Sequence, residues 1–480
     1  MKRISFSLLL CLIISPLVKA QGIVPNPVKI QSKGDRFVFS SINIHVGNFN
    51  SRNGDILVDA LVRRGLKARV IADKKSANVL LLIDENIDSL KHEGYVLDIS
   101  KHRVTIKASN TKGILYGMNS FLQLLDNKDV PIPCVYIEDE PRFKWRAFMI
   151  ENNFRFRELS QIRNILDKMS LYKMNVFYWD ITTFDGLGIE LQKYSSLRKK
   201  NTTKFYSHRD IKEILEYAEV LGITIIPVID IYRIIFEVNQ HDLLKDRDKN
   251  ISNAIKSCFS SIIKENKLCD FVEEIFIETI KLFPSPVVHI TNNKIDYSVY
   301  EKYKSIDSLV YQDNKKKQYS LVDVNLINKV SKLIEKHDRR MSINSSIFKN
   351  YDENNNVDII LDSIKNLSGN IVVHLSKEHI NFLTDFLSKG CDVILDNEYS
   401  NLDYTFLSLN HIYNSDLSLG DNRLKKILGL SLHFLEDQNE IKRDFKGDIL
   451  TFLGLYSELN WTYKHRKNYN TFVKRLGVRG

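Results

Sequence analysis

From about residue 145 onward, short apolar segments alternate with longer amphipathic segments, and this alternation restricts the possible folds more than any other feature of the chain. The short segments have the composition of buried strands, and the longer ones repeat apolar residues at helical spacing. Such an alternation predicts a parallel sheet covered by helices, and eight predicted strands favour a closed barrel. The predicted strands lie near residues 146–151, 175–180, 224–230, 287–290, 340–343, 371–375, 392–395 and 427–432.

Residues 231–266 are too long for an ordinary connection between a strand and a helix. We therefore expect this stretch, which carries Cys258, to form an excursion over the carboxyl end of the barrel.

The first 140 residues follow a different pattern. Strands are predicted at 37–39, 42–46 and 79–83, and 95–99 with 103–107 resembles a hairpin. Helical spacing favours helices at 56–65 and 111–125. The predicted fold class is therefore α/β: a (β/α)8 TIM barrel at 141–463, preceded by a smaller α+β domain at 21–140 with strands packed on helices.

The N-terminus has the features of a cleavable signal peptide. Lys2 and Arg3 precede an apolar run over 6–18, and Val18-Lys19-Ala20 offers a small-residue cleavage site. A signal peptide at 1–20 predicts a secreted or periplasmic protein, while an uncleaved anchor helix remains the alternative. Apart from this segment no stretch has the roughly 20 apolar residues of a membrane-spanning helix, so no integral membrane segment is expected.

The formal net charge of +10 is spread along the chain. The basic runs at 315–317 and in the predicted C-terminal tail at 464–480 are typical of solvated faces, and no nucleic-acid site is predicted. No C-x-x-C motif occurs, so no zinc site, other metal or cofactor is expected. Cys258 and Cys269 form either a disulfide or two free thiols, and the oligomeric state is left open.

Several segments of the chain carry distinctive motifs. They are Glu-Pro-Arg-Phe-Lys-Trp-Arg at 140–146 and the segments at 175–180, 186–190, 222–230, 288–290, 402–404 and 457–461. In this order they resemble motifs of glycoside hydrolase family 20, and residues 113–125 are similar to the accessory domain that precedes the family's barrel. The resemblance implies a β-N-acetylhexosaminidase-like protein whose partner is a glycan containing N-acetylhexosamine.

The resemblance also places the catalytic pair. In this family the acetamide of the substrate attacks the anomeric carbon, an Asp orients it, and the next Glu protonates the leaving oxygen. Asn293 and Lys294 stand at these positions in this chain. Asn293 can accept a hydrogen bond but brings no negative charge, and a lysine is a poor general acid at neutral pH. The resemblance therefore implies impaired or absent catalysis.

Other positions also differ from the family's active-site motifs, and these differences likewise imply impaired catalysis. Val228 replaces a glutamate, and Tyr178 and Asp180 replace two histidines. The tryptophans of this chain align outside the acetamide pocket, where Asn344 and Leu435 stand in place of two of the family's indoles.

Part of the polar site is retained. By resemblance, Arg146 contacts sugar hydroxyls, with an ion pair at the bottom of the barrel as the alternative interpretation. Glu151 replaces an Asp that ends the first strand, and Asp230 and Asp403 match family acids near strand ends. His289 is predicted to be a hydrogen-bonded core histidine. The candidate substrate-binding residues are Arg146, Glu151, Asp180, Asp230, His289 and Asp403.

Three functions remain open. The chain could be a non-catalytic protein that binds a glycan or a partner protein, which the lost carboxylates favour. It could be an active glycosidase with a rebuilt acid/base pair, which the sequence offers as two of Glu151, Asp180, Asp230 and Asp296. An ordinary hexosaminidase is disfavoured, because no other Asp-Glu pair follows a predicted barrel strand.

Overall fold

The fold is known from a computed structural model. It describes residues 22–49, 52–87, 90, 92–125, 131–150, 156–183, 186–192, 204–230, 270–291, 315–347, 357–400, 406–414, 426–435 and 445–477. The predicted signal peptide, the excursion at 231–266, Cys258 and Cys269 lie outside these residues. Cys134 and Cys391 are buried free thiols.

The N-terminal domain is built on one mixed seven-stranded sheet. Its order is β1(Lys29–Phe37), β7(Ile132–Asp139), β5(Tyr95–Ile99), β6(Val104–Ala108), β4(Val79–Ile83), β2(Ile42–Val46) and β3(Ala68–Val70). The predicted α+β domain is confirmed, as is the antiparallel hairpin of β5 and β6. The strand expected at 37–39 is wrong beyond Phe37, because Val38 is 68% exposed and lies past the end of β1.

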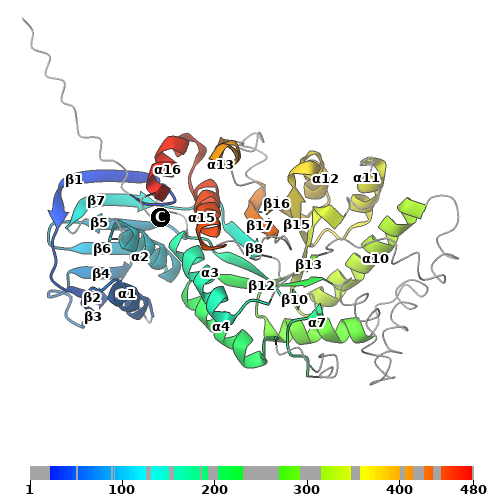
Figure 1. Ribbon diagram of the computed structural model, residues 1–480, viewed down its shortest axis with the longest axis horizontal. Coiled ribbons are helices and arrows are strands. Elements are labelled where there is room, and N and C mark those ends of the chain that lie inside the picture. Colours follow the sequence, from blue (N-terminus) through cyan, green and yellow to red (C-terminus); the bar gives the residue numbers. More distant parts are fainter. Residues whose placement is uncertain are drawn as a thin grey trace, which may run out of the picture.

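Helices α1(Asn53–Val62) and α2(Thr111–Leu125) pack on this sheet. Helix α2 lies between the sheet and the barrel (Figure 1). A Cβ atom at Gly117 would come within 2.5 Å of Ile106, so this glycine permits the close approach of α2 to β6. On the opposite side of α2, Asn119 donates a hydrogen bond of 2.7 Å to the carbonyl oxygen of Ser170 in the barrel domain. Contacts on both sides explain why nearly the whole helix is buried.

Eight parallel strands form the closed barrel, which confirms the predicted fold. In chain order they are β8(Trp145–Ile150), β9(Val176–Asp180), β12(Thr224–Asp230), β13(Val287–Thr291), β14(Arg340–Asn344), β15(Ile371–Ser376), β16(Asp392–Ser400) and β17(Ile427–Leu435). A short hairpin of β10(Thr182–Thr183) and β11(Gly186–Leu187) follows β9.

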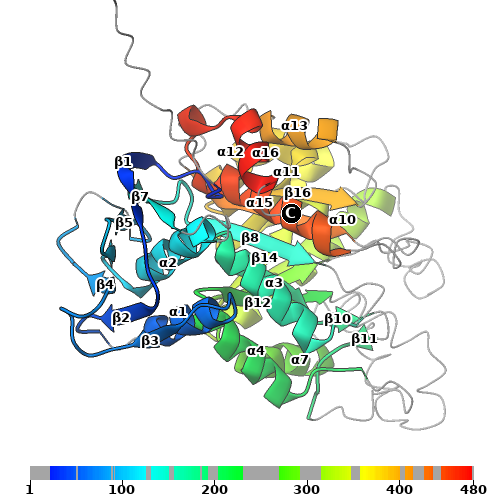
Figure 2. The same cartoon turned by 60° about the vertical axis from the view of Figure 1, so that its left-hand side comes forward.

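Helices surround the barrel (Figure 2). They are α3(Leu159–Leu171), α4(His208–Val220), α7(Asp270–Leu282), α10(Lys315–Glu335), α11(Val357–Asn366), η4(Lys377–Phe382), α12(Leu383–Ser388), α13(Phe406–Asn414) and α15(Phe445–Trp461). Along each strand, alternate residues join the outer core against these helices, and the remaining ones face the barrel interior.

The predicted C-terminal tail is partly folded. After η7(Lys464–Arg466), residues of α16(Tyr469–Gly477) pack against α13 and bury Phe472. Arg475, only 3% exposed, donates a hydrogen bond of 2.7 Å to Glu458 in α15. The apolar face of α16 therefore anchors a segment whose basic composition suggested a solvated tail.

A buried polar junction joins the two domains. The Lys173 ammonium lies 2.8 Å from a carboxylate oxygen of Asp139, and both side chains are fully buried. The other oxygen of Asp139 accepts a hydrogen bond of 2.8 Å from the indole of Trp461. Trp461, the last residue of α15, is packed in the core of the N-terminal domain.

Within the described part of the chain, no helix is long and apolar enough to cross a membrane.

Candidate functional site

The sequence-predicted site residues fall into three groups. Asp180 and Asp230 are the last residues of barrel strands β9 and β12, at the end where active sites of this fold are built, and His289 lies in the middle of β13. Arg146 lies at the opposite end. Glu151, Asn293, Lys294 and Asp403 lie outside the described residues, as does Asp296, so their predicted roles stay predictions.

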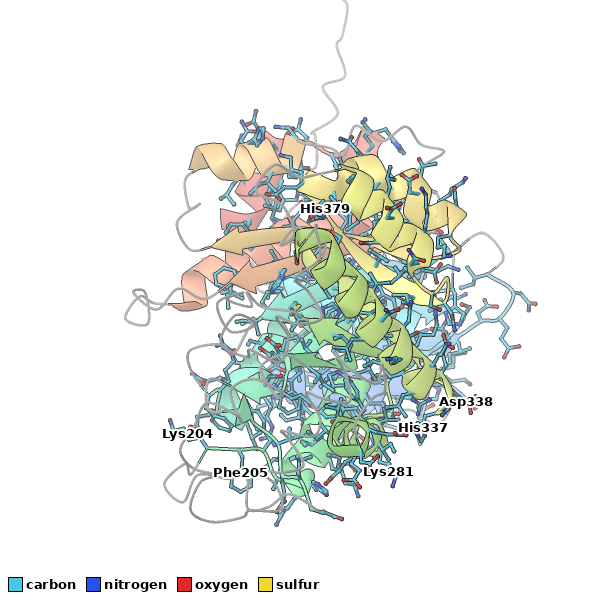
Figure 3. The ribbon with its side chains drawn as sticks, turned by 90° about the vertical axis from the view of Figure 1, so that its right-hand side faces the viewer. Lys204, Phe205, Lys281, His337, Asp338 and His379 are labelled. Carbon is cyan, nitrogen blue, oxygen red and sulfur yellow. The ribbon has the colours of Figure 1, made fainter. Side chains whose placement is uncertain are left out.

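Figure 3 helps to locate the two ends of the barrel. Lys281, His337 and Asp338 precede barrel strands and lie on its amino side. Lys204, Phe205 and His379 lie further toward the other side.

Asp180 and Asp230 are brought together at the ends of adjacent strands. Asp180 in β9 is the Cα partner of Val228, two residues before Asp230 in β12. A carboxylate oxygen of Asp180 accepts a hydrogen bond of 2.9 Å from the backbone of Thr182, whose hydroxyl accepts one of 2.9 Å from the backbone N–H of Asp230. The two acids are 1% and 2% exposed. Thr182 thus fixes the relative position of these two strand ends.

Arg146 is fully buried at the second residue of β8. Its guanidinium forms an ion pair of 2.7 Å with Glu93 of the N-terminal domain and donates a hydrogen bond of 3.0 Å to the hydroxyl of Tyr116. It also lies over the ring of Trp461, 5.0 Å from the centroid. These contacts support the ion pair at the bottom of the barrel rather than sugar contact.

The barrel interior contains a layer of polar aromatic side chains, which we call the histidine layer: Tyr178, His289, His374 and His433. They come from alternate strands β9, β13, β15 and β17, as side chains within one barrel layer do. The rings of His289 and His374 have centroids 4.7 Å apart, and that of Tyr178 lies 5.2 Å and 4.7 Å from these two, respectively. Branched apolar side chains usually fill such layers.

Hydrogen bonds fix two of the imidazoles. His289 Nδ1 lies 2.8 Å from the hydroxyl of Ser342, and His374 Nε2 lies 2.7 Å from that of Tyr178. Burial lowers the pKa of His289 well below its usual value, and the neighbouring His374 and His433 lower it further. Burial likewise lowers the pKa of His374 to about 4. These two imidazoles are therefore neutral near pH 7, and His289 is the hydrogen-bonded core histidine that the sequence predicted.

One carboxylate, Asp396 of β16, lies beside this layer and is 2% exposed. It accepts a hydrogen bond of 3.3 Å from the amide of Asn344, at the position where the resemblance places a pocket tryptophan. His433 Nδ1 is 3.7 Å away. Burial raises the pKa of Asp396, but interactions with His433, His374 and Ser431 outweigh burial and keep the pKa below its usual value.

Sequence reasoning missed His374, Asp396 and His433. The sequence signal that could have found them is spacing, because a residue two positions after an inward-facing one in a strand also faces inward. His374, for example, stands two positions after Val372, which faces the barrel interior. Trp179, in contrast, points outward and packs against Tyr206 and Phe283, in keeping with the resemblance, which places it outside the acetamide pocket. No group of three or more His, Cys, Asp or Glu side chains suited to a metal ion occurs among the described residues.

An eight-stranded parallel barrel preceded by a mixed α+β domain, with buried acids at the carboxyl ends of two adjacent strands, defines a two-domain TIM-barrel protein. The catalytic-domain profile of glycosyl hydrolase family 20 matches residues 143–422, and the profile of domain 2 of the same family matches residues 20–140. The chain belongs to glycosyl hydrolase family 20.

Curated relatives agree with this assignment. A beta-hexosaminidase of Porphyromonas gingivalis is 24% identical over 400 residues, covering 71% of this chain and 49% of the relative. A beta-hexosaminidase of Vibrio furnissii is 26% identical over 269 residues, covering 50% of this chain and 43% of the relative. The chain thus spans less than half the length of these two relatives.

Solved structures share the fold. A family 20 exo β-N-acetylglucosaminidase from Vibrio harveyi, in complex with N-acetylglucosamine, has a TM-score of 0.71 at 20% identity, covering 96% of this chain and 76% of that one. A β-N-acetylhexosaminidase from Bacteroides fragilis also has a TM-score of 0.71 at 20% identity, covering 96% and 94%.

Proposed function

We propose that this chain is a family 20 protein with impaired or absent glycosidase activity, which binds glycans containing N-acetylhexosamine at the carboxyl end of its barrel. One observation carries the proposal. Strand β13 ends at Thr291, and the chain continues as Asn292-Asn293-Lys294, where the family resemblance requires an Asp-Glu pair. The fourth strand of the barrel therefore leads into an amide and an ammonium group instead of two carboxylates.

The physical consequence is a weak catalyst. A neutral amide gives little stabilisation to a cationic intermediate, because it carries no net charge. A lysine has an ordinary pKa of about 10.4, and lowering it to about 7 costs more than about 4 kcal/mol at about 1.36 kcal/mol per unit. General acid catalysis typically contributes about 10²–10⁴-fold, and this contribution would be lost.

A rebuilt active site is the second candidate function, and the placement of Asp180 and Asp230 favours it. They lie at the ends of adjacent strands, joined through Thr182. Two carboxyl groups suffice for glycoside hydrolysis when about 5–10 Å separates them. Against this role, both acids are nearly buried, and Asp180 already holds the turn after β9.

Activity and binding assays distinguish the candidates. We expect purified protein to show no turnover of aryl N-acetylglucosaminides or N-acetylgalactosaminides, while calorimetry detects binding of N-acetylglucosamine oligomers. Turnover that disappears in Asp180→Asn or Glu151→Gln would instead establish the rebuilt site. Absence of both turnover and binding would refute glycan recognition and leave a partner protein as the ligand of the barrel.

We also propose that the protein acts outside the cytoplasm, supported by the apolar N-terminal segment of the sequence. Intact mass of protein from its native host should correspond to a chain beginning at Gln21, and a mass that retains residues 1–20 would contradict this.

A further inference from the structure

The histidine layer is chemically unusual for a barrel interior, because it combines three imidazoles with one phenol. All four residues are at most 2% exposed. Apolar residues occupy the neighbouring interior positions, among them Met149, Val228, Val372 and Ile394. Water therefore has little access to any charge that forms in this layer.

The observed contacts suit neutral imidazoles. Nε2 of His289 has no hydrogen-bond partner among the described residues, so a proton added there would lack an acceptor. The ring of His374 lies only 4.7 Å from that of His289, so two protonated rings would repel each other in a poorly solvated interior. A doubly protonated His374 must donate from Nε2, so the Tyr178 hydroxyl would have to be the acceptor of this hydrogen bond.

Few charges in the described part of the barrel can compensate. Beside the layer, strands β8 and β14 direct only uncharged side chains inward, namely Ala147, Met149, Ser342 and Asn344. At the amino end of the barrel, Arg340 of β14 forms an ion pair of 2.6 Å with Asp392 of β16, so these two charges compensate each other. The remaining titratable side chains on inward faces are Tyr178 and Asp180 of β9, Asp230 of β12, His289 of β13, His374 of β15, Asp396 of β16 and His433 of β17. Asp180 and Asp230 lie at the strand ends, so Asp396 is the carboxylate beside the layer.

We propose that the histidine layer is an acid-responsive element, in which protonation of the buried imidazoles loosens the packing of β9, β13, β15 and β17 in the barrel interior. This inference concerns the fold and does not depend on whether the barrel binds a glycan.

The direction of the effect follows from His374. Its pKa is lowered from 6.5 to about 4 by burial, whereas the unfolded chain binds the same proton near 6.5. Between these values the unfolded state binds more protons, so stability is complete above about pH 6.5 and falls as the pH decreases toward about 4. Titration of Asp396 does not interfere in this pH range. Because its pKa is lowered, the contribution of Asp396 to stability is lost only at still lower pH.

The test compares two single variants. His374→Gln keeps a group that can bond to Tyr178 but cannot be protonated, and His337→Gln removes an exposed histidine on the amino side of the barrel (Figure 3). When the pH falls from about 8 to about 5, protonation of His374 alone is predicted to raise the equilibrium constant for unfolding about 30-fold. We expect His374→Gln to lack this rise in denaturant titrations, and His337→Gln to behave like the unmodified protein.

Equal pH dependence in the unmodified protein and His374→Gln would overturn the proposal. If His374→Gln does not fold, NMR of the unmodified protein decides, because the carbon shifts of imidazoles report protonation directly. We expect the resonances of His289 and His374 not to titrate between about pH 8 and pH 5. Titration of either of them near 6.5 would also overturn the proposal.

Discussion

Lys173 and Asp139 form an ion pair from which water is excluded, and the neighbouring residue of the same strand provides a comparison. Glu138 pairs with Lys29 at 3.1 Å, but these two side chains are 34% and 43% exposed. Breaking a buried pair leaves an uncompensated charge, whereas an exposed pair contributes little. The two pairs should therefore differ greatly in their effect on stability.

We predict that Lys173→Met lowers the free energy of unfolding by about 3–5 kcal/mol. The matched variant Lys29→Met should change it by less than about 1 kcal/mol. Denaturant titration of both variants measures the difference. Equal effects would show that the hydrogen bonds from Tyr95 and Trp461 are enough to hold the buried charge of Asp139.

A second residue-scale prediction concerns the lost catalytic pair. We expect the double variant Asn293→Asp with Lys294→Glu to stay at least about 10²-fold below an ordinary family enzyme. The reason is that Asn344, which is bonded to Asp396, cannot clamp an acetamide as an indole would. Kinetics on an aryl N-acetylglucosaminide test this, and near-family rates would show that the pocket is functional.

At the scale of elements, β8 and β17 close the barrel at a point where their backbones approach closely. Gly429 is the Cα partner of Trp145, and a Cβ atom at Gly429 would lie 1.7 Å from the carbonyl oxygen of Trp145. A backbone atom cannot rotate away as a side chain can, so the strands would have to separate.

We predict that Gly429→Ala lowers the free energy of unfolding by more than the about 1–3 kcal/mol of ordinary overpacking. Gly477→Ala is the control, since nothing lies within 4 Å of a Cβ atom there. Thermal unfolding followed by circular dichroism compares the two. A near-unchanged midpoint for Gly429→Ala would mean that β17 shifts its register without cost.

The elements also show what the sequence could predict. The eight barrel strands were predictable because short apolar segments alternate regularly with amphipathic ones, and α2 because its apolar residues recur at helical spacing. The short strand β3 and the helix α16 were not, because Tyr469 and Phe472 in a basic segment show an apolar face only once α13 and α15 are in place. The histidine layer was missed for a related reason: each imidazole is isolated in sequence, and only closure of the barrel brings the rings together.

At the scale of the whole molecule, the two domains form one unit, because the contact between them is polar and buried and is made by side chains of both domains. The side chains of Arg146, Lys173 and Trp461 are fully buried at the contact with the N-terminal domain. Removing that domain would expose two charges and an indole that are held by Glu93 and Asp139.

We therefore predict that a chain beginning at residue 141 does not unfold cooperatively, whereas the full chain shows one transition by fluorescence and by circular dichroism. The full chain with Trp461→Phe is the intermediate case: it keeps an aromatic ring, smaller than the indole, but loses the hydrogen bond to Asp139. An isolated barrel with the midpoint of the full chain would show that the domains are independent.

The position of Trp461 also has a consequence for biosynthesis. Synthesis on the ribosome is vectorial, and N-terminal domains commonly fold first as they emerge. Here the core of the first domain includes an indole that bonds to Asp139 across 322 residues of sequence. The first domain can be completed only after all eight barrel strands have been translated. Until then its nascent form exposes an open core, and the residue that closes the first domain is made after the strands of the second.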